Sequence, residues 1–374
     1  MQLGAADDLA QRLLGTRHVV LGHEHQRQYA QILGLGDGVG QLAPNEAYAV
    51  EIPARQLRLG ARGPDFGATP HRYLVLPFEN VSAERSLNWI GEALALGVAD
   101  RLELMGLHAL ARAERLDAME AAGVPDGKAV TLATTLKIVA AARADRFVTG
   151  TFRFDPKSGV TVTYRLFDAG RATEISDGTR SGALSGVFSL TDPLVAEAVG
   201  RDLDGAATAL PPTLASFADP PLPIYEAMVR ALLETEPERR LSALQKALEM
   251  DHRSGPVRRY LALEQIGQGQ LPEALASLEG VAAESSPDGW RVNLLRARIL
   301  AAQGNLDGAT AALARSIAAR DTAEAHLLLA RLSATRGDAA RAAAEIDLAA
   351  GLDPTHPELD AARRLVAATP PKTL

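Results

Sequence analysis

Three glycine-centred segments recur in the last third of the chain, and their spacing constrains the fold more than any other feature of its 374 residues. The glycines are Gly269, Gly304 and Gly337, which lie 35 and then 33 residues apart. Around each glycine, an alanine lies seven residues before, another lies five after, and a large aliphatic lies nine after. These positions hold Ala262, Ala297, Ala330, Ala274, Ala309, Ala342, Leu278, Leu313 and Ile346. A period in this range predicts a repeat architecture.

Each repeated position has a physical reason in a pair of antiparallel helices. Glycine adopts positive φ without strain, so it can end the first helix of a pair. Facing alanines let the two helices approach closely, and the large aliphatic residue fills the space toward the next pair. One pair cannot bury its own apolar face, so we expect stacked copies. A degenerate earlier copy covers residues 224–250, and residues 356–368 are predicted to form a capping helix.

The pattern resembles the tetratricopeptide repeat family over about 145 residues, including the closing sequence LDP at 352–354. The aromatic residue usual early in the first helix is replaced by Arg258, Asn293 and His326 in successive copies. The resemblance implies an α-solenoid of about four helical pairs that binds a protein or peptide on its concave face. An irregular helical bundle is the alternative, but it would not readily reproduce this period.

The family's recognition positions imply a set of partner-binding residues in this sequence. They are Arg259, Leu263, Arg291, Leu294, Arg298, Leu327 and Arg331. Arginine binds carboxylates through two parallel hydrogen bonds, so these positions favour an acidic or carboxylate-ended peptide. The competing interpretation is that the arginines pair with local acids such as Glu264 and Glu324.

A proline-rich stretch divides the repeats from the preceding region. Five prolines lie in the thirteen residues 211–223, and such a segment cannot continue a helix. Residues 71–210 form a separate predicted domain. Its pattern predicts strands at 72–78, 107–111, 147–154, 160–167 and, more weakly, 173–180. Helices are predicted at 88–105, 128–142 and 190–209, which gives a mixed sheet with helices packed on it.

Two motifs in this middle region resemble the TolB-like amino-terminal domain. The first is the apolar run 74–80 (LVLPFEN) followed by 87–94 (LNWIGEAL), and the second is 145–152 (DRFVTGTF) followed by the strand to Asp168. The resemblance covers residues 72–203, although the usual tryptophan of the last strand is missing near 175–177. It implies a non-catalytic domain, associated with the bacterial cell envelope or appended to regulatory proteins.

Composition and motifs argue against several classes of activity. The chain has no cysteine, which excludes disulfides, thiolate nucleophiles and cysteine zinc sites, and its net charge of −7 does not favour nucleic acid. No glycine-rich phosphate loop follows the first strand, and no G-x-S-x-G motif occurs. Glu79 and Asn80 end a strand, where α/β proteins place ligands, but a turn at Asn80 and a solvated Glu79 are the favoured interpretation.

Residues 1–70 form a poorly defined segment with one chemically suggestive stretch, 16–25 (TRHVVLGHEH). A strand that ends in Gly-His-x-His resembles the last metal-binding segment of calcineurin-like metallophosphoesterases. The upstream aspartate, asparagine and histidine ligands are absent, so no metal site and no cofactor are expected. The alternatives are a chance match and a partial duplicate of the middle domain. The glycines of 33–40 lack the setting of a phosphate loop.

The sequence therefore predicts a mixed-sheet TolB-like α/β domain followed by a tetratricopeptide α-solenoid at 224–368. We expect a non-catalytic protein-interaction or scaffold protein. The alternatives are a phosphoesterase remnant fused to a repeat module and the regulatory part of a bacterial signalling protein. Location is ambiguous: the TolB-like resemblance implies the envelope, yet the first eight residues are acidic and lack the features of a signal peptide. No stretch is long and apolar enough to span a membrane.

Overall fold

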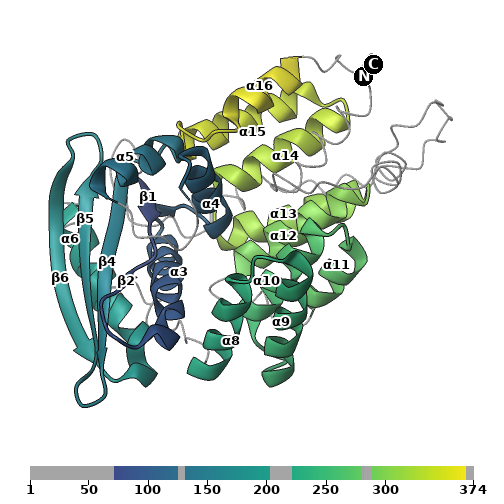
Figure 1. The fold of residues 1–374 in the computed structure, drawn as a ribbon. Coiled ribbons are helices and arrows are strands. Elements are labelled where there is room, and N and C mark those ends of the chain that lie inside the picture. The colour runs from purple at the N-terminus through teal and green to yellow at the C-terminus, as the bar shows by residue number, and fades with distance from the viewer. Residues whose placement is uncertain (1–70, 125–130, 203–220, 280, 282–288, 368–374) are drawn as a thin grey trace. The chain divides into compact units, whose positions relative to one another are not determined.

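The computed structural model describes residues 71–124, 131–202, 221–279, 281 and 289–367 (Figure 1). The chain forms two compact units that divide between Val257 and Arg258. One unit contains a mixed sheet, its helices and the first helical pair, and the other contains the remaining helical pairs. The expected fold class, an α/β region followed by helical repeats, is confirmed.

A six-stranded mixed sheet is the centre of the first unit. Its strands are β1 (Arg72–Val75), β2 (Glu79–Asn80), β3 (His108–Ala109), β4 (Arg146–Asp155), β5 (Gly159–Asp168) and β6 (Thr173–Gly182). The order is β3-β1-β4-β5-β6, and β2 pairs with β4 beyond the end of β1. β1 runs parallel to β3 and β4, whereas β4, β5 and β6 form an antiparallel meander. The weakly predicted last strand is as long as its neighbours.

Helices cover both faces of the parallel part of the sheet. They are α3 (Trp89–Leu104), α4 (Arg112–Ala121), α5 (Leu132–Ala141) and α6 (Thr191–Asp202), with two 3₁₀ segments, η2 (Arg85–Leu87) and η3 (Leu184–Leu190). Alternation along β1 separates the two layers. Tyr73 faces α3 and α6 together with Val148, whereas Leu74 packs with α4 and α5 and with Phe147. The period of two in these strands therefore determines which helices lie on which face.

Helix α4 was not predicted from the sequence pattern, and neither were the short strand β2 and the 3₁₀ segments η2 and η3. Only three of the ten residues of α4 are buried, namely Arg115, Ala118 and Met119, so it lacks a clear apolar stripe. The predicted ends at 128 and beyond Asp202 lie outside the described residues. The other predicted strands and helices of residues 72–202 are present, with ends shifted by a few residues.

The segments 74–80 and 87–94, which form the first sequence motif of the middle region, meet at Phe78 and Gly91. The Phe78 backbone N–H donates to the Gly91 carbonyl at 3.0 Å. A Cβ atom at Gly91 would lie 2.1 Å from the Phe78 carbonyl oxygen, and one at Gly150 would lie 2.2 Å from the Phe78 ring. The chain at Phe78, between β1 and β2, can approach both α3 and β4 only because glycine occupies positions 91 and 150.

The first helical pair, α8 (Leu222–Leu232) and α9 (Pro237–Met250), belongs to the same compact unit as the sheet. Arg112 donates to the Leu232 carbonyl at 2.8 Å, and Arg230 donates to the Ser86 carbonyl at 2.6 Å. The Phe188 and Tyr225 rings also pack together, with centroids 4.3 Å apart. The domain limits predicted above stay a prediction, because most of the segment 211–223 lies outside the described residues.

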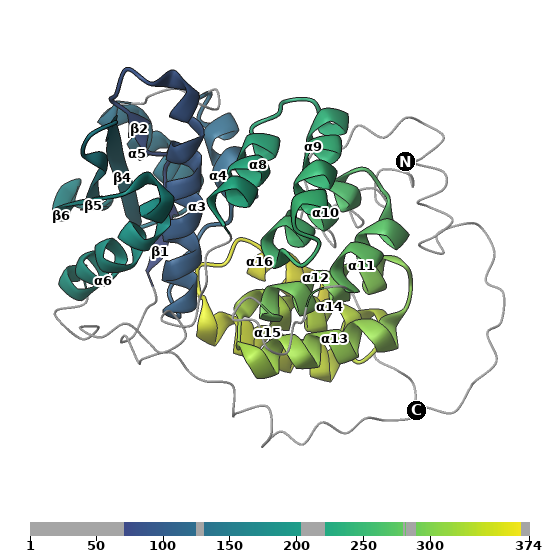
Figure 2. The same ribbon diagram turned by 90° about the horizontal axis from the view of Figure 1, so that it is seen from below.

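The second unit consists of stacked helices from α10 onward. They are α10 (Gly255–Gly267), α11 (Leu271–Glu279), α12 (Gly289–Ala302), α13 (Leu306–Ala319), α14 (Ala323–Thr335), α15 (Ala339–Leu352) and α16 (Leu359–Ala367). In both views α13 lies beside α12 and α15 lies beside α14 (Figures 1 and 2). The three predicted hairpins and the predicted capping helix are therefore confirmed.

The periodic residues occupy the positions that the pattern predicts. Gly269, Gly304 and Gly337 have φ of 76°, 77° and 75°, which is the left-handed conformation expected at the end of a first helix. The six alanines and three large aliphatics of the pattern are all buried, none more than 3% exposed. Ala262, Ala274 and Leu278 lie in one apolar cluster, so α10 and α11 pack against each other within this repeat.

Replacing Gly91 with alanine should destabilise the first unit by about 2–3 kcal/mol, because the new Cβ would overlap a backbone oxygen that cannot move without breaking the β1–α3 connection. Chemical denaturation followed by circular dichroism measures the change. Gly186→Ala is the matched control, since nothing lies within 4 Å of its Cβ position. Equal stability of the two variants would contradict the steric explanation of the motif.

Candidate partner-binding site

The predicted partner-binding residues lie on the first helices of successive pairs, α10, α12 and α14. Leu263, Arg298 and Arg331 each lie six residues before the turn glycine of their repeat, so they occupy equivalent places. The stacking repeats this position along the second unit. The structure therefore gives these three side chains a common structural context, although it contains no partner that would test their role.

Arg298 and Arg331 both form ion pairs with an acid of the following repeat. The Arg298 guanidinium contacts Glu324, the second residue of α14. The Arg331 guanidinium contacts Glu358, immediately before α16. The sequence named Glu324 as a competing acid but not Glu358, although Glu358 follows Glu324 by 34 residues, which is one repeat. Periodicity was the signal that could have identified this second pair.

Two of the predicted residues are core residues. Leu327 is fully buried, packed with Ala330 and Ile346, and Leu294 is 4% exposed in the cluster around Leu313. Their expected direct contact with a partner is corrected here, because a side chain packed inside a cluster does not reach the surface. Leu263 is half-buried and remains accessible in part.

The other two arginines lie over aromatic rings. The Arg259 guanidinium is 4.7 Å from the centre of the Tyr260 ring, and that of Arg291 is 5.1 Å from the centre of the Trp290 ring. Arg320 also lies over Trp290, at 4.8 Å. Such cation–π contacts orient a guanidinium and are worth about 0.5–1 kcal/mol at partly exposed sites.

Two of the three residues that replace the usual aromatic residue, Arg258 and His326, contact the second helix of their own pair. Arg258 donates to the Ser277 carbonyl at 3.0 Å. His326 contacts Glu345 at 2.6 Å, and its other ring nitrogen contacts Asp321 at 2.6 Å. Ser277 and Glu345 both lie eight residues after the turn glycine. A polar contact within each hairpin therefore replaces aromatic packing in these two repeats.

The middle repeat lacks this contact. Asn293 is 3% exposed, and its Oδ1 has no hydrogen-bond partner within the described part of the chain. The residue eight positions after Gly304 is Ala312, whose side chain cannot pair with Asn293 as that of Glu345 pairs with His326. A buried acceptor without a partner costs free energy, so this repeat carries a polar group that does not contribute to its stability.

His326 is positively charged at neutral pH. Burial opposes the charged form, but the hydrogen bonds to Asp321 and Glu345 and the attraction of their charges outweigh this effect. Together they raise the pKa of His326 to about 9. The imidazolium between two carboxylates thus joins the start of α14 to α15.

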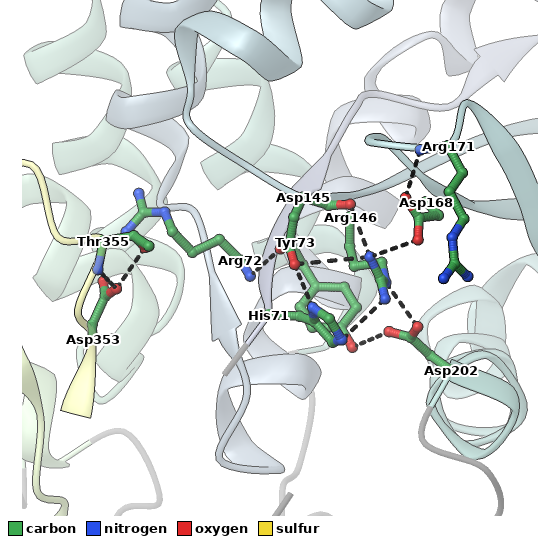
Figure 3. A network of polar contacts seen from close by, with 10 residues as sticks. All are labelled: His71, Arg72, Tyr73, Asp145, Arg146, Asp168, Arg171, Asp202, Asp353 and Thr355. Carbon is green, nitrogen blue, oxygen red and sulfur yellow. Dashed lines mark hydrogen bonds and ion pairs between the residues drawn. The ribbon is translucent and has the colours of Figure 1, made fainter. Parts of the chain in front are cut away.

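The first unit contains a polar network that joins the starts of β1 and β4 to the ends of β5 and α6 (Figure 3). Arg146 at the start of β4 donates from Nε to Asp202 at 2.7 Å and pairs with Asp168 at 3.3 Å. Tyr73 donates to the other Asp202 oxygen at 2.5 Å. These contacts bind the ends of β1, β4, β5 and α6 together, and burial with the nearby Asp202 carboxylate raises the pKa of Tyr73.

His71, the residue before β1, completes this network. Arg146 Nη2 lies 3.0 Å from His71 Nε2, and because a guanidinium only donates, this ring nitrogen must accept. The His71 Nδ1–H then donates to Asp145. Burial raises the pKa of Asp145, but the hydrogen bonds from His71 and from the Arg72 N–H prevail and hold it below its usual range. Each group of the network has a partner inside the unit, so its role is structural.

A second network, which the sequence did not reveal, surrounds Glu92 at the start of α3. Glu92 is 3% exposed, accepts from Arg112 at 2.8 Å and also accepts from Arg115. Burial raises the pKa of this carboxyl, but the two arginines outweigh burial and lower it. Arg112 also binds the last turn of α8, so the network fastens the first helical pair to the sheet unit.

Asn80 and Glu79 behave as the favoured interpretation predicts. The Asn80 Oδ1 accepts from the Ser82 N–H at 3.0 Å, and its amide donates to the Glu84 carbonyl at 2.9 Å, so Asn80 organises a turn. Glu79 is exposed. Within the described ranges no group of three or more histidine, aspartate or glutamate side chains is placed to hold a metal ion. The stretch 16–25 lies outside these ranges.

Residues 265–332 match the tetratricopeptide repeat family model. No curated protein matches the chain. The match indicates a protein-interaction or scaffold role with a protein partner. No comparison supports the metallophosphoesterase resemblance.

Several solved structures are similar to parts of the chain at low identity. The LpoB C-terminal domain from Salmonella enterica has 12% identity and a TM-score of 0.25, over 31% of this chain and 86% of that one. Lipoprotein GNA1162 from Neisseria meningitidis has 19% identity and a TM-score of 0.28, over 36% of this chain and 99% of that one. TolB from Acinetobacter baumannii has 15% identity and a TM-score of 0.27, over 38% of this chain and 30% of that one. Similarities at this level carry no functional conclusion. Among the described helices, none is long and apolar enough to cross a membrane.

Replacing Asn293 with leucine should raise the free energy of unfolding by about 1 kcal/mol, because it removes a buried Oδ1 that has no hydrogen-bond partner among the described residues. Thermal and chemical denaturation measure the effect. Ala312→Ser provides the cross-check: position 312 is equivalent to Glu345, which contacts His326, so a hydroxyl there should stabilise the chain with Asn293 but not with leucine. Destabilisation by Asn293→Leu would show that the amide makes a favourable contact there.

The contribution of His326 to stability should depend on pH. Its pKa of about 9 in the folded chain exceeds the ordinary value of 6.5, so the stabilisation is fully present below pH 6.5 and is lost as the pH rises through 9. The difference in free energy of unfolding between wild type and His326→Gln should therefore fall from at most about 3 kcal/mol at pH 6 toward its minimum at pH 10. His252→Gln, at an exposed histidine, serves as the control. A difference that does not change with pH would mean that His326 is neutral.

Proposed function

We propose that the chain is a non-catalytic adaptor that binds a protein or peptide partner through the first helices of its tetratricopeptide hairpins. The observation that supports this proposal is the match of residues 265–332 to the repeat family, together with hairpins whose turn glycines and buried alanines follow one period. The surface that we propose is the concave face formed by α10, α12 and α14.

The proposed partner is an acidic or carboxylate-ended peptide. Arg291, Arg298 and Arg331 lie on α12 and α14, whereas the chain as a whole has a net charge of −7. A local excess of guanidinium groups on an acidic protein favours a negatively charged partner, through both steering and paired hydrogen bonds. Leu263 adds an apolar contact at the equivalent position of α10. Leu294 and Leu327 support this face from within the core.

The full chain should select acidic sequences from a random peptide library displayed on phage. Replacing Arg298 and Arg331 together with glutamine should weaken binding of a selected peptide at least about tenfold, because hydrogen bonds to charged groups contribute more than neutral ones. Fluorescence anisotropy with the synthetic peptide measures this. Arg315→Gln combined with Arg364→Gln removes the same charge from exposed positions on α13 and α16 and should have little effect.

Two results would contradict the proposal. One is a library selection that enriches no peptide above background. The other is equal weakening by the two double variants, which would mean that binding follows net charge and not the α12–α14 face.

A further inference from the structure

The two ion pairs between repeats form a regular ladder. Arg298 and Arg331 occupy equivalent positions of α12 and α14, and each pairs with a glutamate further along the chain, Glu324 in α14 or Glu358 just before α16. The same interaction is thus made twice, one repeat apart. A regular pair of this kind is a feature of the stacked arrangement and not of one hairpin.

Within each pair the glutamate is the more exposed partner. The Arg298 side chain is 20% exposed and that of Glu324 is 36% exposed. For Arg331 and Glu358 the values are 11% and 34%. Each arginine side chain is therefore mostly covered by the protein, whereas about a third of each glutamate side chain is open to solvent.

We propose that Glu324 and Glu358 are internal substitutes for the carboxylates of the partner, which compete with them for Arg298 and Arg331. This inference rests on the proposed peptide binding and describes its regulation. When the partner binds, its acidic side chains pair with the two arginines, and the two glutamates turn into solvent. In the absence of partner, the glutamates keep the arginines paired and oriented.

The energetics favour such an exchange. Partly exposed ion pairs contribute only about 0–1 kcal/mol, so displacing a glutamate costs little. The incoming carboxylate meets an arginine whose side chain is already ordered, which lowers the entropic cost of binding. A neutral peptide cannot compete, because it would leave the glutamates paired. The device therefore selects against partners without two acidic groups.

The ladder ends at the preceding repeat, where Leu263 takes the arginine position and Arg291 takes the glutamate position. The exchange is thus confined to two carboxylate sites, on α12 and α14. A partner that fits would place two acidic side chains one repeat apart and an apolar side chain toward α10.

The test compares full-length wild type with the Glu324→Gln, Glu358→Gln double variant. The probes are two fluorescent twelve-residue peptides with amidated ends, one with glutamate and the other with glutamine at alternate positions, and binding is read by fluorescence anisotropy. Removing the internal carboxylates should tighten binding of the glutamate peptide about threefold to tenfold, as expected for two weak pairs released together. Binding of the glutamine peptide should not change.

Glu273→Gln combined with Asp347→Asn is the matched control, since it raises the net charge equally at exposed positions on α11 and α15. Tightening by the Glu324/Glu358 variant beyond that of this control supports the inference. Binding of the glutamate peptide by wild type with no such additional tightening overturns the inference and leaves the proposed function standing. Failure of wild type and of both variants to bind the glutamate peptide overturns the inference together with the acidic specificity on which it rests. Thermal unfolding of each variant verifies that it is folded.

Discussion

Close packing of helices across buried alanines is the interaction on which the second unit depends. Ala262 faces Ala274, and the corresponding alanines recur in the next two hairpins, all of them excluded from water. A larger residue there would separate the helices and open the apolar clusters around Leu278 and Leu313. The left-handed glycine at each turn is the second requirement, because it reverses the chain within a few residues. The regular spacing of the first helices, and hence of the arginines, follows from these two constraints.

The first unit depends on a different interaction: the buried carboxylate of Glu92 is neutralised by arginines of another helix. Glu92 is held by Arg112 and Arg115, and Arg112 also binds the end of α8. A buried carboxylate without these partners would be strongly destabilising, so α3 and α4 depend on each other, and Arg112 joins α8 to them. This explains why the first helical pair lies in the same compact unit as the sheet, although its sequence resembles the repeats that follow.

The proposed binding face combines both devices. Alanine packing fixes where Arg298 and Arg331 lie, and the glutamates that pair with them fix how their guanidinium groups are oriented. The same acids that stabilise the stacking then determine which partners can compete. A single pair of charges can serve stability in the free chain and selectivity in the bound one, provided that the pair is weak enough to exchange.

The sequence by itself determined the repeat period, the turn glycines and the buried small residues, because each hairpin meets the same local packing requirement with residues at fixed spacing. It also determined the order of strands and helices in the sheet unit, where apolar alternation is clear. It did not determine helix α4, whose buried face contains an arginine, nor the partners of Arg112 and Arg331, although it named Glu324, the acid that Arg298 contacts. Only the tertiary structure decided these, since the paired groups lie 20 or more residues apart and a charge shows no preferred partner until the fold brings one within reach. Burial of Leu294 and Leu327 was likewise decided by the neighbouring helices, whose positions no single repeat contains.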